Sequence, residues 1–336
     1  MISETPQMGN SENEIERLIE LGDQLDDQGE TDEALECWRK VVELERDASL
    51  LCRFGRLAMK AERWEEALGA LLEAVNLDPN LTFAYQYLAV LHQDLGSLEK
   101  ALFYSKKSLS IEKSAPSYTL LGGAQLRLDM VEAARESFSY ALNLDPGYDE
   151  AYYLLGWTYR TEDPLRAVEL FRKAVHLDPK YAVAHVELGW ALRCLLEYPE
   201  AEYHLRRSIE LDESNGWAHV YLGNTLWAQR DFSGAEECFK RSIEVWPESS
   251  TPFWSLAIFY EYEGRPDDAE KLYLQALRID PDDPVTNNSF GKYLKDSGRF
   301  ETARIFIERA LALDPDDRAI ESALAEIAET GDEMQS

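Results

Sequence analysis

Residues 151–180 read AYYLLGWTYRTEDPLRAVELFRKAVHLDPK, and this stretch decides the fold. It places Leu155-Gly156 early, Ala167 eleven residues later, Phe171 one turn further, and a Leu-Asp-Pro end at 177–179. Related ends (LDPN, LDPG, IDPD and LDPD) recur along the chain at multiples of about 34 residues. A period of this length predicts an array of small repeated units.

Two small residues recur in every unit. The first follows Leu or Phe at a spacing of 33 or 34: Gly22, Gly55, Ala89, Gly122, Gly156, Gly189, Gly223, Ala257 and Gly291. The second is an alanine about twelve residues later: Ala34, Ala67, Ala101, Ala134, Ala167, Ala201, Ala235, Ala269 and Ala303. About one turn after it come large residues: Trp38, Leu71, Phe138, Phe171, Leu205, Phe239, Tyr273 and Phe306, with Ser105 in the third unit.

The steric reason for this pattern is close packing of two antiparallel helices. A Gly or Ala on one helix and an Ala on the next let the backbones approach, while larger residues fill the flanks. Each unit is therefore expected to be a helix pair.

The pattern resembles the tetratricopeptide repeat family over residues 15 to about 317. In the fourth unit the matching residues are Tyr118, Leu121, Gly122, Ala134, Phe138, Ala141 and Pro146. The resemblance implies an all-α, right-handed superhelical solenoid of about nine helix-turn-helix repeats.

The repeat boundaries are predicted at 15–47, 48–81, 82–114, 115–148, 149–181, 182–215, 216–249, 250–283 and 284–317. Residues 318–330 are apolar at Ile320, Leu324 and Ile327 with charges between, which predicts a helix that caps the array. The polar tails 1–14 and 331–336 lack periodicity, so we expect them to be disordered.

Three repeats depart from the pattern. Repeat three has Ser105 and Ser108 at core positions, which makes its seam with repeat four a candidate hinge. Repeat five is one residue shorter between Gly156 and Ala167, so its turn should be shorter. Repeat nine has Asn287 where an aromatic residue is usual.

Charge and composition exclude several functions. The 336 residues hold 64 acidic and 34 basic side chains, a net charge of −30, which would repel a nucleic-acid backbone. No stretch is apolar enough to cross a membrane and the N-terminus shows no targeting signal, so we expect a cytoplasmic protein.

Catalytic and metal-binding motifs are missing from the sequence. It has no HExxH, GxSxG, GxxxxGK[ST] or GxGxxG, and its four cysteines form no CxxC pair. His185 and His219 share a core position in adjacent repeats and are predicted to pack rather than to bind metal. The chain is expected to need no cofactor and to have no enzyme activity.

The resemblance implies a concave groove lined by the first helix of each repeat, with positions 2, 5, 9 and 12 facing inward. In repeats five to eight, such a groove would be rich in Trp, Tyr and Arg, the residues that most often anchor interfaces. The candidate partner-binding residues, with two at position 6, are Tyr153, Trp157, Arg160, Glu187, Trp190, Arg193, Trp217, Tyr221, Asn224, Trp227, Trp254 and Glu261. Alternatively, each Trp simply packs against the next repeat.

A second candidate is the small basic group Arg53, Arg56 and Lys60 in repeat two, with solvated charges as the alternative interpretation. The principal functional hypothesis is a non-enzymatic scaffold, monomeric or dimeric, that holds an extended segment of another protein in the groove. One alternative is the regulatory or substrate-recruiting subunit of a multi-chain enzyme, such as a glycosyltransferase or protease. The other is a homodimer that assembles through the groove.

Overall fold

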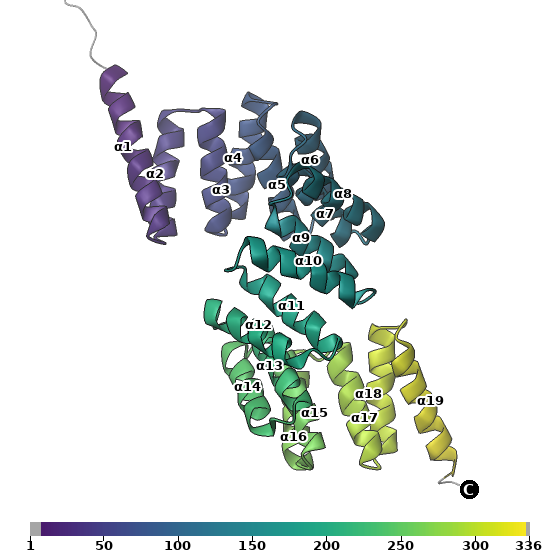
Figure 1. The fold of residues 1–336 in the computed structure, drawn as a ribbon. Helices are drawn as coiled ribbons and strands as arrows, with labels where there is room; N and C mark the ends of the chain where they lie inside the picture. The colour runs from purple at the N-terminus through teal and green to yellow at the C-terminus, as the bar shows by residue number, and fades with distance from the viewer. Residues whose placement is uncertain (1–7, 334–336) are drawn as a thin grey trace, which may run out of the picture. The chain divides into compact units, whose positions relative to one another are not determined.

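The computed structural model describes residues 8–333, with side chains from 13 to 326. Over this range the chain forms nineteen α-helices and no strand (Figure 1). The helices are α1 (Met8–Asp27), α2 (Thr31–Leu44), α3 (Ala48–Lys60), α4 (Trp64–Leu77), α5 (Thr82–Asp94), α6 (Leu98–Ile111), α7 (Ala115–Arg127), α8 (Val131–Leu144), α9 (Asp149–Tyr159), α10 (Pro164–Leu177), α11 (Ala182–Cys194), α12 (Tyr198–Leu211), α13 (Gly216–Ala228), α14 (Phe232–Val245), α15 (Thr251–Tyr262), α16 (Pro266–Ile279), α17 (Pro284–Asp296), α18 (Phe300–Leu313) and α19 (Arg318–Glu333).

The helices follow one another as pairs, and from residue 48 to 317 each predicted segment contains one pair. The first pair differs, because α1 begins at Met8 and thus includes half of the tail expected to be disordered. The rest of that tail, and residues 334–336 at the other end, lie outside the described residues.

Two compact units make up the chain, one ending at Tyr159 and the other starting at Arg160. We call them unit 1 and unit 2. The division falls at the shortened turn of repeat five. The seam between repeats three and four lies inside unit 1 and is hydrogen-bonded: Ser117 Oγ lies 2.8 Å from Ser108 Oγ and accepts from Gln86 Nε2 at 3.1 Å.

The close approach inside each helix pair has the steric origin that the sequence indicated. A Cβ atom added at Gly189 would lie 2.5 Å from Cγ of Leu205, a distance that real Cβ atoms do not reach. One correction applies to repeat nine, where Ile307 rather than Phe306 faces the glycine, Gly291. Ile307 stands four residues after Ala303, the spacing found in the other repeats, and is fully buried, whereas Phe306 is half-buried.

The first helices of neighbouring repeats also contact one another. In unit 1, α3 contacts α5, α5 contacts α7 and α7 contacts α9; in unit 2 the series is α11, α13, α15 and α17. Among the described helices, the second helices of neighbouring repeats make no comparable contacts. Each unit therefore bends toward its first helices, and these form its inner face.

A side-chain bond to the preceding turn recurs in unit 2. His185 Nε2 donates to the Pro179 carbonyl at 3.3 Å, and His219 Nε2 donates to the Glu213 carbonyl at 3.2 Å. Asn287 Nδ2 makes the same bond six residues back, to the Pro281 carbonyl at 2.9 Å. The prediction that the two histidines pack is confirmed, since both are buried. The unusual Asn287 keeps this bond without an aromatic ring.

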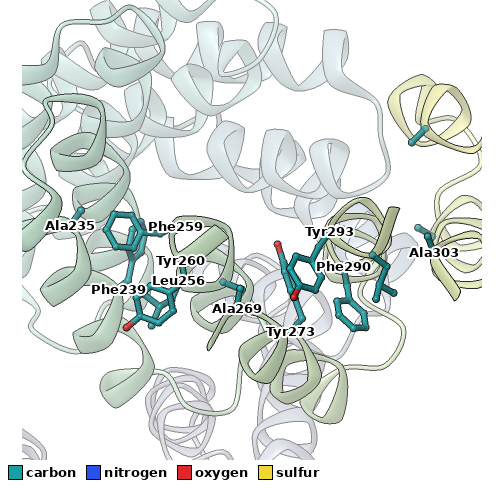
Figure 2. Close-up of a cluster of buried hydrophobic side chains, with 14 of the residues drawn as sticks. Ala235, Phe239, Leu256, Phe259, Tyr260, Ala269, Tyr273, Phe290, Tyr293 and Ala303 are labelled. Atoms are coloured by element: carbon teal, nitrogen blue, oxygen red, sulfur yellow. The ribbon is translucent and has the colours of Figure 1, made fainter. Parts of the chain in front are cut away.

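One hydrophobic core cluster of unit 2 extends from Leu205 in α12 to Ala323 in α19. Figure 2 shows Phe239, Phe259 and Tyr260 in one group of rings, and Tyr273, Phe290 and Tyr293 in the next. Neighbouring rings lie 5.4–6.0 Å apart, for example Tyr273 to Phe290 at 5.4 Å. At the end of the array, α19 buries Ile320 and Ala323 against this core.

Candidate functional site

The Arg160 side chain joins three repeats on the inner face of unit 2. Its Nε lies 2.9 Å from Oε2 of Glu187 in α11, and its Nη2 donates to the hydroxyl of Tyr221 in α13 at 2.9 Å. The guanidinium carbon also lies 4.0 Å from the ring centroid of Trp190. Arg160 directly follows α9, so the turn of repeat five presents this charge to the next two first helices.

This cluster carries an excess of positive charge. Burial raises the pKa of Glu187, and the nearby Arg160 opposes that shift by favouring the carboxylate. Arg193 adds a second guanidinium close enough to lower the pKa of Tyr221 and of Cys194, although burial raises both overall. The Nε of Arg193 is buried and has no hydrogen-bond partner among the described residues.

Aromatic rings continue the same face. Trp217 in α13 lies 5.3 Å from Tyr221 and 5.3 Å from Trp246, measured between ring centroids, and remains 41% exposed. Trp246 directly follows α14 and is not among the residues predicted for this face. The signal for its role was Gly216: a Cβ there would lie 2.6 Å from the Trp246 ring.

Three residues predicted to bind a partner on this face pack against or hydrogen-bond to other residues of the chain. Trp227 packs edge-on against Phe259 at 5.5 Å and against Tyr262 at 5.3 Å, and Trp254 is half-buried against the core. Glu261 accepts a hydrogen bond from the hydroxyl of the buried Tyr273. Trp227 thus packs against the next repeat, as the packing alternative for the tryptophans anticipated, and the Glu261 bond joins the two helices of its own repeat.

The remaining predicted groove residues differ in position and burial. Asn224 is half-buried on α13 in unit 2. Tyr153 and Trp157 lie on α9 and so belong to unit 1, where Tyr153 is half-buried and Trp157 is 41% exposed.

The basic residues of repeat two are engaged with the acidic first repeat. Arg53 binds both carboxylate oxygens of Asp23 at 2.8 Å and lies 4.3 Å from the ring centroid of Trp38. Lys60 binds Asp26, and Arg56 lies 3.5 Å from the same carboxylate. The Lys60 hydrogen bond is the main reason that the pKa of Asp26 is lowered.

In the part of the chain that the structure describes, no three His, Cys, Asp or Glu side chains converge as metal ligands would. No helix within 8–333 combines the length and apolarity needed to span a bilayer.

These observations define an all-α helix-pair repeat protein whose units expose aromatic and arginine side chains on their inner faces. A tetratricopeptide repeat family model matches residues 19–82, 119–182 and 222–284, more than half of the chain, and a second one matches 262–327. The chain therefore belongs to the tetratricopeptide repeat family.

One similar curated protein is the TPR repeat-containing protein YpiA of Bacillus subtilis, 26% identical over 144 residues. The match covers 43% of this chain and about a third (34%) of YpiA.

Solved structures share the fold at low identity. The APC/C hetero-tetramer Cut9-Hcn1 gives a TM-score of 0.64 at 17% identity, over 88% of this chain and 58% of that chain. A tetratricopeptide repeat protein from Parabacteroides merdae gives 0.63 at 17% identity, over 73% and 98%. Yeast Tom70 gives 0.52 at 17% identity, over 94% and 81%.

Proposed function

We propose that the protein is a non-enzymatic scaffold that binds an extended segment of another protein along the inner face of unit 2. Membership of the tetratricopeptide repeat family supports a protein-interaction role. Cut9-Hcn1, which shares the fold, is itself a hetero-tetramer.

The observation that carries the proposal is the set of unused contacts on this face. Arg193 holds a buried Nε without a partner among the described residues, and Trp217 leaves 41% of its surface exposed. An exposed indole costs free energy that a bound segment would recover by covering it.

The chemistry of the partner follows from these groups. Trp217 would cover an apolar side chain, and Arg193 would donate to a backbone carbonyl or a carboxylate of the segment. Arg160 is already held by Glu187 and Tyr221, so it gives the surface a rigid positive charge at little entropic cost on binding.

Two variants and one control test the proposal. Trp217→Ala and Arg193→Gln alter exposed or half-buried groups on first helices, whereas Tyr203→Ala removes an aromatic residue that is 63% exposed on the second helix α12. Folding of all three is checked by circular dichroism. Proteins captured from native lysate are then quantified by mass spectrometry.

Supporting evidence would be a protein retained by the wild type and by Tyr203→Ala but lost from both first-helix variants. The stoichiometry of that complex separates a transient scaffold from a constitutive enzyme subunit. Equal capture by all four chains refutes the assignment to this face, and a wild-type dimer that captures nothing supports self-assembly instead.

A further inference from the structure

A cavity of about 220 Å³ opens between α3 and α5 in unit 1. Its lining includes Cys52, Arg53 and Arg56 of α3. Leu81, directly before α5, and Phe83 and Tyr87 within α5 also line it. Small-molecule sites usually exceed about 300 Å³, so this cavity has room for one large side chain rather than a complete ligand.

The walls of the cavity are mainly apolar. Cys52 is buried, and burial raises the pKa of its thiol to about 11, so the sulfur stays uncharged. Leu81 and Tyr87 are half-buried, whereas Phe83 is 61% exposed beside the cavity. An exposed ring at the edge of an apolar cavity is the arrangement that interface anchors use.

The ion pairs beside the cavity leave Arg56 with the longest carboxylate contact. Asp23 is bound bidentately by Arg53, and Asp26 is bound by Lys60 at closer range than by Arg56. Three cations thus face two carboxylates, and Arg56 is the cation with the weakest partner. Its side chain is 45% exposed, which leaves the guanidinium accessible to a second carboxylate.

The aromatic pair at this cavity repeats the one in unit 2. Phe83 and Tyr87 hold the second and sixth positions of repeat three, and Trp217 and Tyr221 hold the same positions of repeat seven. In repeat seven the tyrosine receives a hydrogen bond from Arg160. In repeat three the Arg56 charge acts on Tyr87, so each aromatic pair lies beside a guanidinium.

We propose that this cavity is a second binding site, which takes one aromatic or large aliphatic side chain of a peptide segment while Arg56 binds an adjacent aspartate or glutamate carboxylate. The site goes beyond the proposed function, because it lies in unit 1 and uses none of the residues of the unit 2 face. An acidic residue of the segment is favoured because Arg56, the cation with the weakest partner, carries a guanidinium, which can pair with a carboxylate bidentately.

Short peptides test the proposal on the full chain. N-acetyl-Phe-Asp-amide is titrated into the isotopically labelled protein by NMR, beside the neutral isostere N-acetyl-Phe-Asn-amide and the truncated N-acetyl-Ala-Asp-amide. A charge-assisted hydrogen bond is roughly twice as strong as a neutral one, so the Asp peptide should bind about tenfold more tightly than the Asn peptide. The shifted resonances should include Cys52 and Tyr87.

Three variants complete the design. Arg56→Gln should remove the preference for Asp over Asn, and Phe83→Ser should weaken both peptides; neither is expected to unfold the chain, because both side chains are exposed. Arg63→Gln, which alters an exposed pair with Asp32, is the matched control and should keep the preference.

Equal affinity for the Asp and Asn peptides, absence of binding at millimolar concentration, or shifts centred on Trp217 and Tyr221 would each overturn the proposal. None of these results affects the capture experiment on unit 2, so the two proposals fail separately.

Discussion

The Arg160 guanidinium lies 4.0 Å from the ring centroid of Trp190, while its nitrogens hold Glu187 and Tyr221. A planar cation can stack on an indole and form hydrogen bonds at its edge simultaneously. The residue that follows α9 thus fixes side chains on α11 and α13. This contact shapes the face to which we assign partner binding.

Arg160→Lys should destabilise unit 2 by about 1–2 kcal/mol, because an ammonium group cannot stack and also satisfy both oxygen partners. Urea denaturation followed by tryptophan fluorescence measures the change. The control is Arg206→Lys at the exposed Glu202 pair, with an expected change of no more than about 0.5 kcal/mol. Equal midpoints for wild type and Arg160→Lys would show that the cluster is not structurally coupled.

Two glycine substitutions should change the free energy of unfolding in opposite directions. Gly189→Ala places a methyl group 2.5 Å from Leu205 and should cost about 1–3 kcal/mol through overpacking. Gly69→Ala, in α4, meets nothing within 4 Å and should stabilise by about 0.5–1 kcal/mol through helix propensity. Thermal denaturation of both variants decides the matter, and stabilisation by Gly189→Ala would contradict the close-approach argument.

Asn287→Ala should destabilise repeat nine by about 1–3 kcal/mol, because the Pro281 carbonyl loses its donor inside a buried position. Asn287→His should recover much of that loss, since His185 and His219 make the equivalent bond. Denaturant midpoints give the comparison. A histidine variant as unstable as the alanine variant would show that the three positions are not interchangeable.

Stability should fall on mild acidification. His204 Nδ1 lies 2.9 Å from His185 Nδ1, and burial, followed by the charge of His185, lowers the pKa of His204 to about 4. In the unfolded chain His204 binds a proton near pH 6.5, whereas in the folded chain it stays neutral down to about pH 4. The contribution of neutral His204 to the free energy of unfolding is therefore complete above pH 6.5 and is lost as the pH falls toward 4.

The expected loss from His204 is about 1 kcal/mol between pH 7 and pH 5.5. Burial lowers the pKa of His92, His185 and His219 as well, which adds to the same trend. Replacing the titrating ring, His204→Phe, should flatten the dependence in thermal melts. A slope identical to that of the wild type would refute the assignment.

The repeat pattern was sufficient to predict the helix pairs, because Gly189 and the other small residues report a local steric requirement that recurs with the period. The same reasoning located His185, His219 and the capping role of Ile320. It was wrong at Phe306: an aromatic residue was expected to face Gly291, but Ile307, four residues after Ala303, lies there.

The candidate sites were only partly predictable. Position in the repeat gave Trp217 and Arg193, but the contacts that engage Trp227 and Glu261 join side chains from different helices and carry no fixed spacing. Phe83 and Tyr87 were missed, although they hold the same repeat positions as Trp217 and Tyr221. Charge had drawn attention to Arg56, whereas the cavity beside it depends on packing.

Hydrogen exchange on the complex with the captured partner tests the central claim most directly. We predict that binding protects amides of α11, α13 and α15, the first helices of repeats six to eight, and leaves the exchange of α12, α14 and α16 unchanged. Protection confined to the second helices, or to neither set, would contradict the assignment of partner binding to the inner face.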